Sequence, residues 1–130
     1  NGLSYRMVEY GSYGEDGFKQ LVNSAKFCFL INGTESQGIA VQEIMSMGVP
    51  IIAWDIKEWL DQGEAYRVSA TSIPYWDERC GEVFFNKDEL EETFSKFYAT
   101  INEYDPKSFI RDNLSFSKTV EQLMEIFDAD

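Results

Sequence analysis

Apolar and polar positions along the chain alternate in blocks that predict strands and helices in turn. Two short runs are almost wholly apolar, residues 27–31 and 50–54, and each is bounded by polar residues, glycine or proline. Such runs are typical of strands that are buried on both faces of a sheet. We therefore expect two central strands, the first followed by Asn32 and the second by Asp55.

Longer segments carry apolar residues at the spacing of one helix face. We expect helices over residues 14–23, 39–47, 87–101, 105–112 and 117–127. The clearest of them opens on Asn86 and Glu89, which suit a capping box. Gly48 suits the end of the helix over 39–47, and Asp105 with Pro106 suits the start of the fourth helix.

Weaker patterns predict further short elements. These are a strand over 3–8, one helical turn within 56–62, a strand within 66–74, near 69–73, and a strand over 81–85. Buried strands that alternate with amphipathic helices imply an α/β fold, a Rossmann-like parallel sheet with helices on both faces. Ligands of such sheets bind beyond the carboxyl ends of the strands, which here are the loop over 32–38 and the loop that begins at Asp55.

Composition narrows the possible functions. The chain has 130 residues, one domain's worth, and carries 23 acidic against 11 basic residues, a formal net charge of −12. Nucleic acids and anionic membranes bind basic surfaces, so neither is expected as a partner. No apolar run is long enough to span a membrane and no secretory leader is evident, so we expect a cytoplasmic protein.

The chain has no histidine, which excludes histidine-based acid–base chemistry, catalytic triads and histidine-ligated metals. Cys28 and Cys80 lie far apart, and we expect both to be reduced and structural. Asp77 and Glu78 lack the preceding aspartate of an Asp-x-Asp metal motif. We therefore expect neither a required metal nor a cofactor.

The segment over 32–43 joins a predicted buried strand to the start of a helix. Gly38 would let the backbone approach a ligand closely, and the first N–H groups of the helix favour a diphosphate. Glu35 lies just before this helix and Glu43 lies on it, among apolar positions. A carboxylate in such surroundings needs hydrogen-bond donors, and the hydroxyl groups of a sugar or ribose would supply them.

The spacing of Glu35 and Glu43 resembles the Glu-x7-Glu motif of retaining GT-B glycosyltransferases. The stretch over 35–53, with Gly38, Gly48 and Pro50 in register, is similar to the family-4 pattern E-[GS]-F-G-x4-E-A-M-A-x-G-x-P-V-[IV]-A. The resemblance extends over nearly the whole chain. It implies that residues 1–130 are one C-terminal nucleotide-sugar-binding domain, one lobe of a GT-B fold from a longer two-domain enzyme.

The resemblance also implies roles for single residues. Glu35 would contact the transferred sugar in catalysis, and Glu43 would accept hydrogen bonds from the ribose hydroxyls. Backbone amides would hold the sugar or the diphosphate at Ser36, Gln37, Gly38 and Ile39. The donor would be a UDP- or GDP-sugar. The acceptor, a glycan, a lipid or a small molecule, would bind an N-terminal domain, without which we expect little or no transfer.

Two departures and several alternatives accompany this interpretation. Gln37 replaces the usual Phe of the family pattern, and the upstream Arg and Lys that neutralise the diphosphate are not found. The glutamates could instead be solvated surface residues, and we expect Trp54, Trp59 and Trp76 to pack rather than bind ligand. A non-catalytic sugar-nucleotide-binding or scaffold module, which would need a partner chain, is the main functional alternative. A flavodoxin-like or receiver domain is another.

Overall fold

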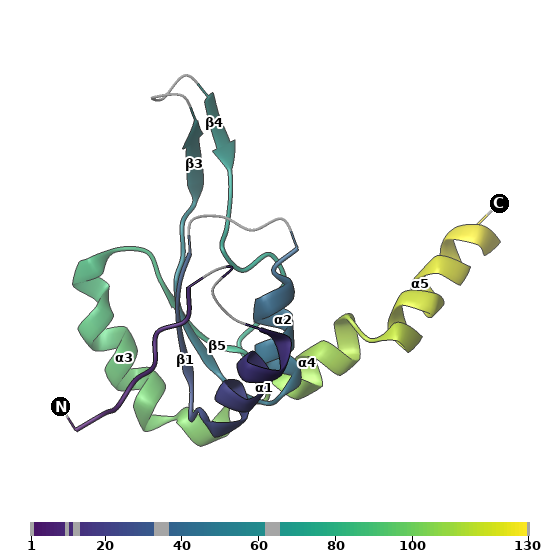
Figure 1. Ribbon diagram of the computed structural model, residues 1–130. Helices are drawn as coiled ribbons and strands as arrows, with labels where there is room; N and C mark the ends of the chain where they lie inside the picture. The colour runs from purple at the N-terminus through teal and green to yellow at the C-terminus, as the bar shows by residue number, and fades with distance from the viewer. Residues whose placement is uncertain (1, 10, 12–13, 33–36, 62–65, 130) are drawn as a thin grey trace.

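A computed structural model describes residues 2–9, 11, 14–32, 37–61 and 66–129 of the chain. Its centre is a three-stranded parallel sheet in the order β1-β2-β5, formed by β1 (Cys28–Ile31), β2 (Ile51–Trp54) and β5 (Gly81–Phe84). Helices cover both faces of this sheet (Figure 1). They are α1 (Glu15–Ser24), α2 (Ile39–Ser46), α3 (Leu90–Ala99) and α4 (Pro106–Asn113), with short 3-10 turns η1 (Lys87–Glu89) and η2 (Ile101–Glu103). The predicted Rossmann-like α/β fold is confirmed.

The central strand β2 separates two apolar cores. Ile51 and Ala53 pack on one face, in a core shared with α1, α2 and α4. Ile52 packs on the other face, in a core shared with Phe84 and with Phe97 of α3. The side chains of Ile51, Ile52 and Ala53 are fully buried, because successive residues of a strand point to opposite faces and helices cover both. The prediction of a strand buried on both faces is confirmed for β2.

The same prediction is wrong for one face of β1. The strand forms where expected, and Cys28 and Leu30 pack against the core of α1, α2 and α4. Its other face leaves Phe29 38% and Ile31 68% exposed. The reason is that β1 is an edge strand within the described sheet, and the aromatic cluster of α3 meets the preceding residue, Phe27, rather than the end of the strand.

The predicted helix ends are confirmed in detail. Gly48 has φ +82° just beyond α2, where its N–H donates to the Met45 carbonyl while the Val49 N–H donates to the Ile44 carbonyl. This pair of bonds is the Schellman arrangement. Asn86 and Glu89 form the expected capping box. Asp105 accepts a hydrogen bond from the Ser108 N–H at 3.2 Å, with proline at the first helical position of α4.

Two predicted elements are wrong. Residues 3–8 form no strand and are exposed, because their apolar positions find no sheet to pair with among the described residues. The helical turn expected within 56–62 is a strand, β3 (Glu58–Asp61), which pairs antiparallel with β4 (Tyr66–Ser69). This β3–β4 hairpin projects from the body of the domain (Figure 1). The strand expected within 66–74 is confirmed as β4, but it lies earlier than residues 69–73, because pairing with β3 determines its position.

The last helix, α5 (Phe116–Asp128), also extends away from the sheet (Figure 1). Ser115 caps its start, where the hydroxyl accepts a hydrogen bond from the Lys118 N–H at 3.2 Å. The helix is present as expected, but its apolar residues are exposed in the described structure. The exposed fractions are Phe116 84%, Val120 40%, Leu123 49%, Met124 52%, Ile126 69% and Phe127 69%.

Arg79 joins α4 to the loop that precedes β5. Its guanidinium pairs with Asp77 and with Asp112, each at 2.9 Å, and lies 5.6 Å from the centre of the Phe109 ring. Hydrogen bonds from Arg79 hold the pKa of both carboxyl groups below the usual value of 3.8. The pairing therefore links the position of α4 to the ionised state of two carboxylates.

Replacing Gly81 with alanine should strongly destabilise the domain. Gly81 has φ +146°, and an added Cβ would lie 1.7 Å from the carbonyl oxygen of Ile51 on the neighbouring strand. We expect Gly81→Ala to lower the free energy of unfolding by about 3 kcal/mol or more, measured by urea denaturation. Gly17→Ala is the matched control, because nothing lies within 4 Å of its added Cβ and it is helical. It should leave stability unchanged or raise it by up to about 1 kcal/mol.

Acid should weaken the attachment of α4. A carboxylate whose pKa is depressed by folding contributes stability that is present above its unfolded-state pKa and is lost as the pH falls through its folded-state pKa. We expect the free energy of unfolding to decline below about pH 4. Arg79→Gln should be destabilised at pH 7 but differ less from the parent near pH 2, whereas the exposed control Arg6→Gln should match the parent throughout. An equal loss at both pH values would assign the effect of Arg79 to packing on Phe109.

Candidate functional site

The predicted ligand-binding segment leads into α2 at the carboxyl edge of the parallel sheet. Gly38 directly precedes α2, is buried, and has φ +67°. A Cβ at this position would meet Cδ of Pro74 at 3.4 Å, in a backbone conformation that residues with side chains rarely adopt. The ring of Pro74, in the loop after β4, thus lies next to the backbone where α2 begins.

The first turn of α2 has backbone donors with no partner among the residues that the structure describes. The first hydrogen bond within the helix joins the Gln42 N–H to the Gly38 carbonyl at 2.9 Å. No side chain among the described residues caps the start of the helix. The N–H groups of the first turn therefore point out of the helix end, where their partial positive charge favours an anion.

The structure describes four of the six predicted site residues, since Glu35 and Ser36 lie outside the described ranges. Gln37 is exposed, and its carbonyl accepts a hydrogen bond from Gln42 Nε2 at 2.6 Å. Ile39 is 65% exposed, and Gly38 is the buried residue between them. These residues gather at the start of α2.

Glu43 lies one helical turn further along α2 than Ile39 and is half-buried. Its carboxylate forms no hydrogen bond or ion pair with any residue that the structure describes. It acts on Lys19 of α1 only as one minor contributor to the raised pKa of that ammonium group, behind Glu15. The Glu43 carboxylate is therefore available to a ligand that approaches the start of α2.

The Asp55 carboxylate holds the loop that follows β4. The sequence patterns did not identify Asp55 as a site residue. It follows β2, is 7% exposed, and its carboxylate accepts hydrogen bonds from the Thr71 hydroxyl at 2.8 Å and from the Ser72 N–H at 2.7 Å. The Ser72 hydroxyl and the Ile56 N–H also donate to it. A lone carboxylate directly after a wholly apolar strand is the sequence feature that could have identified it.

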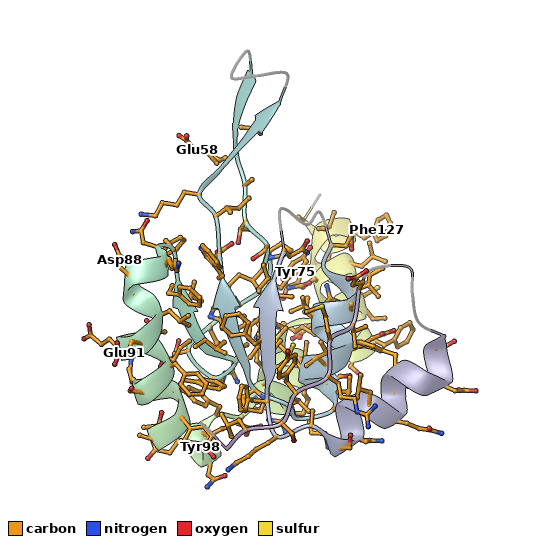
Figure 2. All side chains as sticks on the ribbon, turned by 60° about the vertical axis from the view of Figure 1, so that its left-hand side comes forward. Glu58, Tyr75, Asp88, Glu91, Tyr98 and Phe127 are labelled. Carbon is orange, nitrogen blue, oxygen red and sulfur yellow. The ribbon has the colours of Figure 1, made fainter. Side chains whose placement is uncertain are left out.

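The Asp55 network determines where the next residues lie. It closes the base of the β3–β4 hairpin and holds Ser72 and Ile73 in the interior, so that Pro74 is placed against Gly38. The following residue, Tyr75, is 40% exposed and lies near the carboxyl end of the sheet in Figure 2. One buried carboxylate therefore connects the end of β2 with the start of α2.

The aromatic and thiol side chains near this edge have structural roles. Trp54 stacks on Phe84 with ring centres 5.7 Å apart, and Trp76 packs against the core of α1, α2 and α4, as expected. The side chain of Trp59 lies outside the described part of the structure. Burial raises the pKa of Cys28 and of Cys80 to about 11, so both thiols are protonated at neutral pH. Both are free, as the sequence predicted.

The described residues contain neither a metal-binding cluster nor a membrane-spanning helix. No group of three or more aspartate, glutamate, cysteine or histidine side chains there is arranged to hold a metal ion. No helix in those parts of the chain combines the length and the apolar character needed to cross a bilayer.

Comparisons of the chain with known protein families, with curated proteins and with solved structures found no match. The groups at the start of α2 and the sequence pattern around them therefore carry the information about function.

Removing the Asp55 carboxylate should destabilise the domain. Asp55→Ala leaves buried hydroxyl and N–H donors without a partner, and we expect it to lower the free energy of unfolding by about 3 kcal/mol in urea denaturation. Asp55→Asn should lose less, because one amide oxygen still accepts the bond from Ser72. Asp88→Ala, at a residue whose side chain points into solvent in Figure 2, should change stability by less than about 0.5 kcal/mol. Equal losses in the Asp55→Ala and Asp88→Ala variants would contradict the role of the network.

Proposed function

We propose that the chain is the nucleotide-sugar-binding domain of a GT-B-type retaining glycosyltransferase. The observation that carries the proposal is the start of α2. N–H groups without a partner among the described residues lie there at the carboxyl edge of a parallel sheet, and one turn away is the Glu43 carboxylate, which also has no hydrogen-bond partner among those residues. These features lie within the family-4-like stretch over 35–53. The fold, the site and the sequence pattern thus support the same kind of ligand, a nucleoside diphosphate linked to a sugar.

The groups of this site match the parts of such a donor. The diphosphate would accept hydrogen bonds from the N–H groups at the start of α2, where the helix dipole favours negative charge. Glu43 would accept hydrogen bonds from the ribose hydroxyls, which relieves the desolvation of its half-buried carboxylate. Glu35 would orient the transferred sugar, and backbone amides at Ser36 and Gln37 would contact the sugar or the diphosphate.

Catalysis in this proposal is positional and electrostatic. The amides at the start of α2 would stabilise charge that develops on the leaving diphosphate as the sugar bond breaks. The acceptor would approach from an N-terminal domain, and the upstream Arg and Lys of the family, which residues 1–130 do not contain, would help to stabilise the leaving diphosphate. Transfer would take place in the cytoplasm, a reducing compartment that agrees with two free cysteines. We expect the 130-residue domain by itself to bind the donor weakly and to transfer little or no sugar.

A nucleotide titration followed by NMR tests this proposal. We would add UDP, GDP, ADP and CDP, with their common sugar conjugates, and follow the backbone amide signals of the domain. One nucleotide class should bind with a Kd of roughly millimolar and shift the signals of Gly38 and Ile39. Glu43→Ala should weaken that binding by about tenfold, the effect of losing one hydrogen bond to a charged group.

Two controls locate the effect. Glu125→Ala removes an exposed carboxylate of α5 and should leave nucleotide binding unchanged. Inorganic pyrophosphate should bind the parent and Glu43→Ala equally, because in this proposal Glu43 contacts ribose rather than phosphate. The proposal fails if no nucleotide at millimolar concentration shifts the signals at the start of α2, or if Glu43→Ala and Glu125→Ala behave alike.

A further inference from the structure

A pocket lies at the same edge of the sheet but on the opposite face from α2. It is an open pocket of about 250 Å³ lined by Ile31, Asn32, Trp54 and Ile56. These residues follow or end β1 and β2, and Trp54 belongs to the aromatic core under α3. The pocket is thus distinct from the start of α2, whose buried side chains pack on the other side of the sheet.

The pocket exists because α3 covers only part of its face of the sheet. Phe84 and Phe97 are fully buried beneath that helix. Around the pocket the apolar side chains stay open to solvent, with Ile31 68%, Phe29 38% and Phe85 37% exposed. Exposed apolar side chains gathered around a concavity, rather than scattered singly, mark a surface that takes a ligand.

Trp54 gives the pocket a fixed aromatic wall. Its ring stacks on Phe84 at 5.7 Å with an angle of 27° between the ring planes. Its indole N–H donates to the Phe85 carbonyl at 3.1 Å. Because this polar group is already paired, the indole offers a ligand only its ring surface. A rigid ring of this kind binds another flat ring without losing side-chain freedom.

One basic residue follows a pocket-lining residue directly in the sequence. Lys57 follows Ile56, and its Nζ lies 4.7 Å from the centre of the Phe85 ring. Its ammonium forms no ion pair with any carboxylate that the structure describes. In a domain of net charge −12, a cation with no ion pair among the described carboxylates, next in sequence to a residue that lines an aromatic pocket, attracts a negatively charged group.

We propose that this pocket binds a planar ring that carries a negative charge. The ring lies against Trp54 between Ile31 and Ile56, and the charged substituent points towards Lys57. The site does not depend on the nucleotide-sugar function, because it shares no residue with the start of α2.

Phenyl phosphate is the probe, and NMR signals of the Trp54 indole N–H and of the Ile31 and Ile56 methyl groups are the readout. Benzyl alcohol supplies the ring without the charge, and inorganic phosphate supplies the charge without the ring. Phenyl phosphate and benzyl alcohol should both shift these signals, with an affinity for benzyl alcohol about threefold lower. Inorganic phosphate should not shift them. Threefold is the scale expected of one exposed ionic contact.

Three variants separate the contributions. Lys57→Gln should bring the affinity for phenyl phosphate down to that for benzyl alcohol. Ile31→Ser, at an exposed position, should weaken the binding of both. Ile126→Ser is its matched control, because Ile126 is 69% exposed on α5, and it should leave both affinities unchanged.

The proposal is overturned if phenyl phosphate leaves the Trp54 signal unmoved, or if Ile31→Ser and Ile126→Ser bind it equally well. It is also overturned if inorganic phosphate shifts the pocket signals as much as phenyl phosphate does. Shifts at Gly38 alone would place the ligand at the start of α2, which would support the nucleotide site and reject this pocket.

Discussion

The buried carboxylate of Asp55 is the constraint on which the edge of this domain depends. A carboxyl group in the interior is stable only when hydrogen-bond partners surround it, and here two hydroxyls and two backbone N–H groups do so. One of these N–H groups belongs to the next residue, Ile56, and the other three donors belong to Thr71 and Ser72, sixteen and seventeen residues away across the β3–β4 hairpin. The hairpin can therefore project without loosening the loop that touches Gly38, and the start of α2 keeps its shape.

The parallel sheet was predictable because its information is local. The run of residues around Ile51 is apolar without interruption, and the glycine and proline that follow α2 leave little choice about where that helix ends. The hairpin was not predictable in the same way. Glu58 to Asp61 alternate in no pattern that separates a helical turn from a strand, and only pairing with Tyr66 to Ser69 decides between them.

The candidate site likewise has parts that local sequence predicts and parts that depend on contacts between distant residues. The position of Gly38 and Glu43 follows from the strand–loop–helix pattern, and the structure brings both to one edge of the sheet. The contact between Gly38 and Pro74, the Asp55 network and the pocket beside Trp54 were not predictable, because each joins residues that lie far apart in the chain. Exposure of Ile31 is another such case, since its apolar run alone indicates burial.

The extended position of α5 gives the domain an uneven distribution of stability. A helix of thirteen residues in water is marginal without tertiary packing, and in the described part of the chain the apolar side chains of α5 are all at least 40% exposed. The helices that flank the sheet, by contrast, share closed cores with β2. Local opening should therefore begin at α5 while the sheet remains intact, so that α5 forms a separate unit of low cooperativity whose amide protons exchange with solvent first.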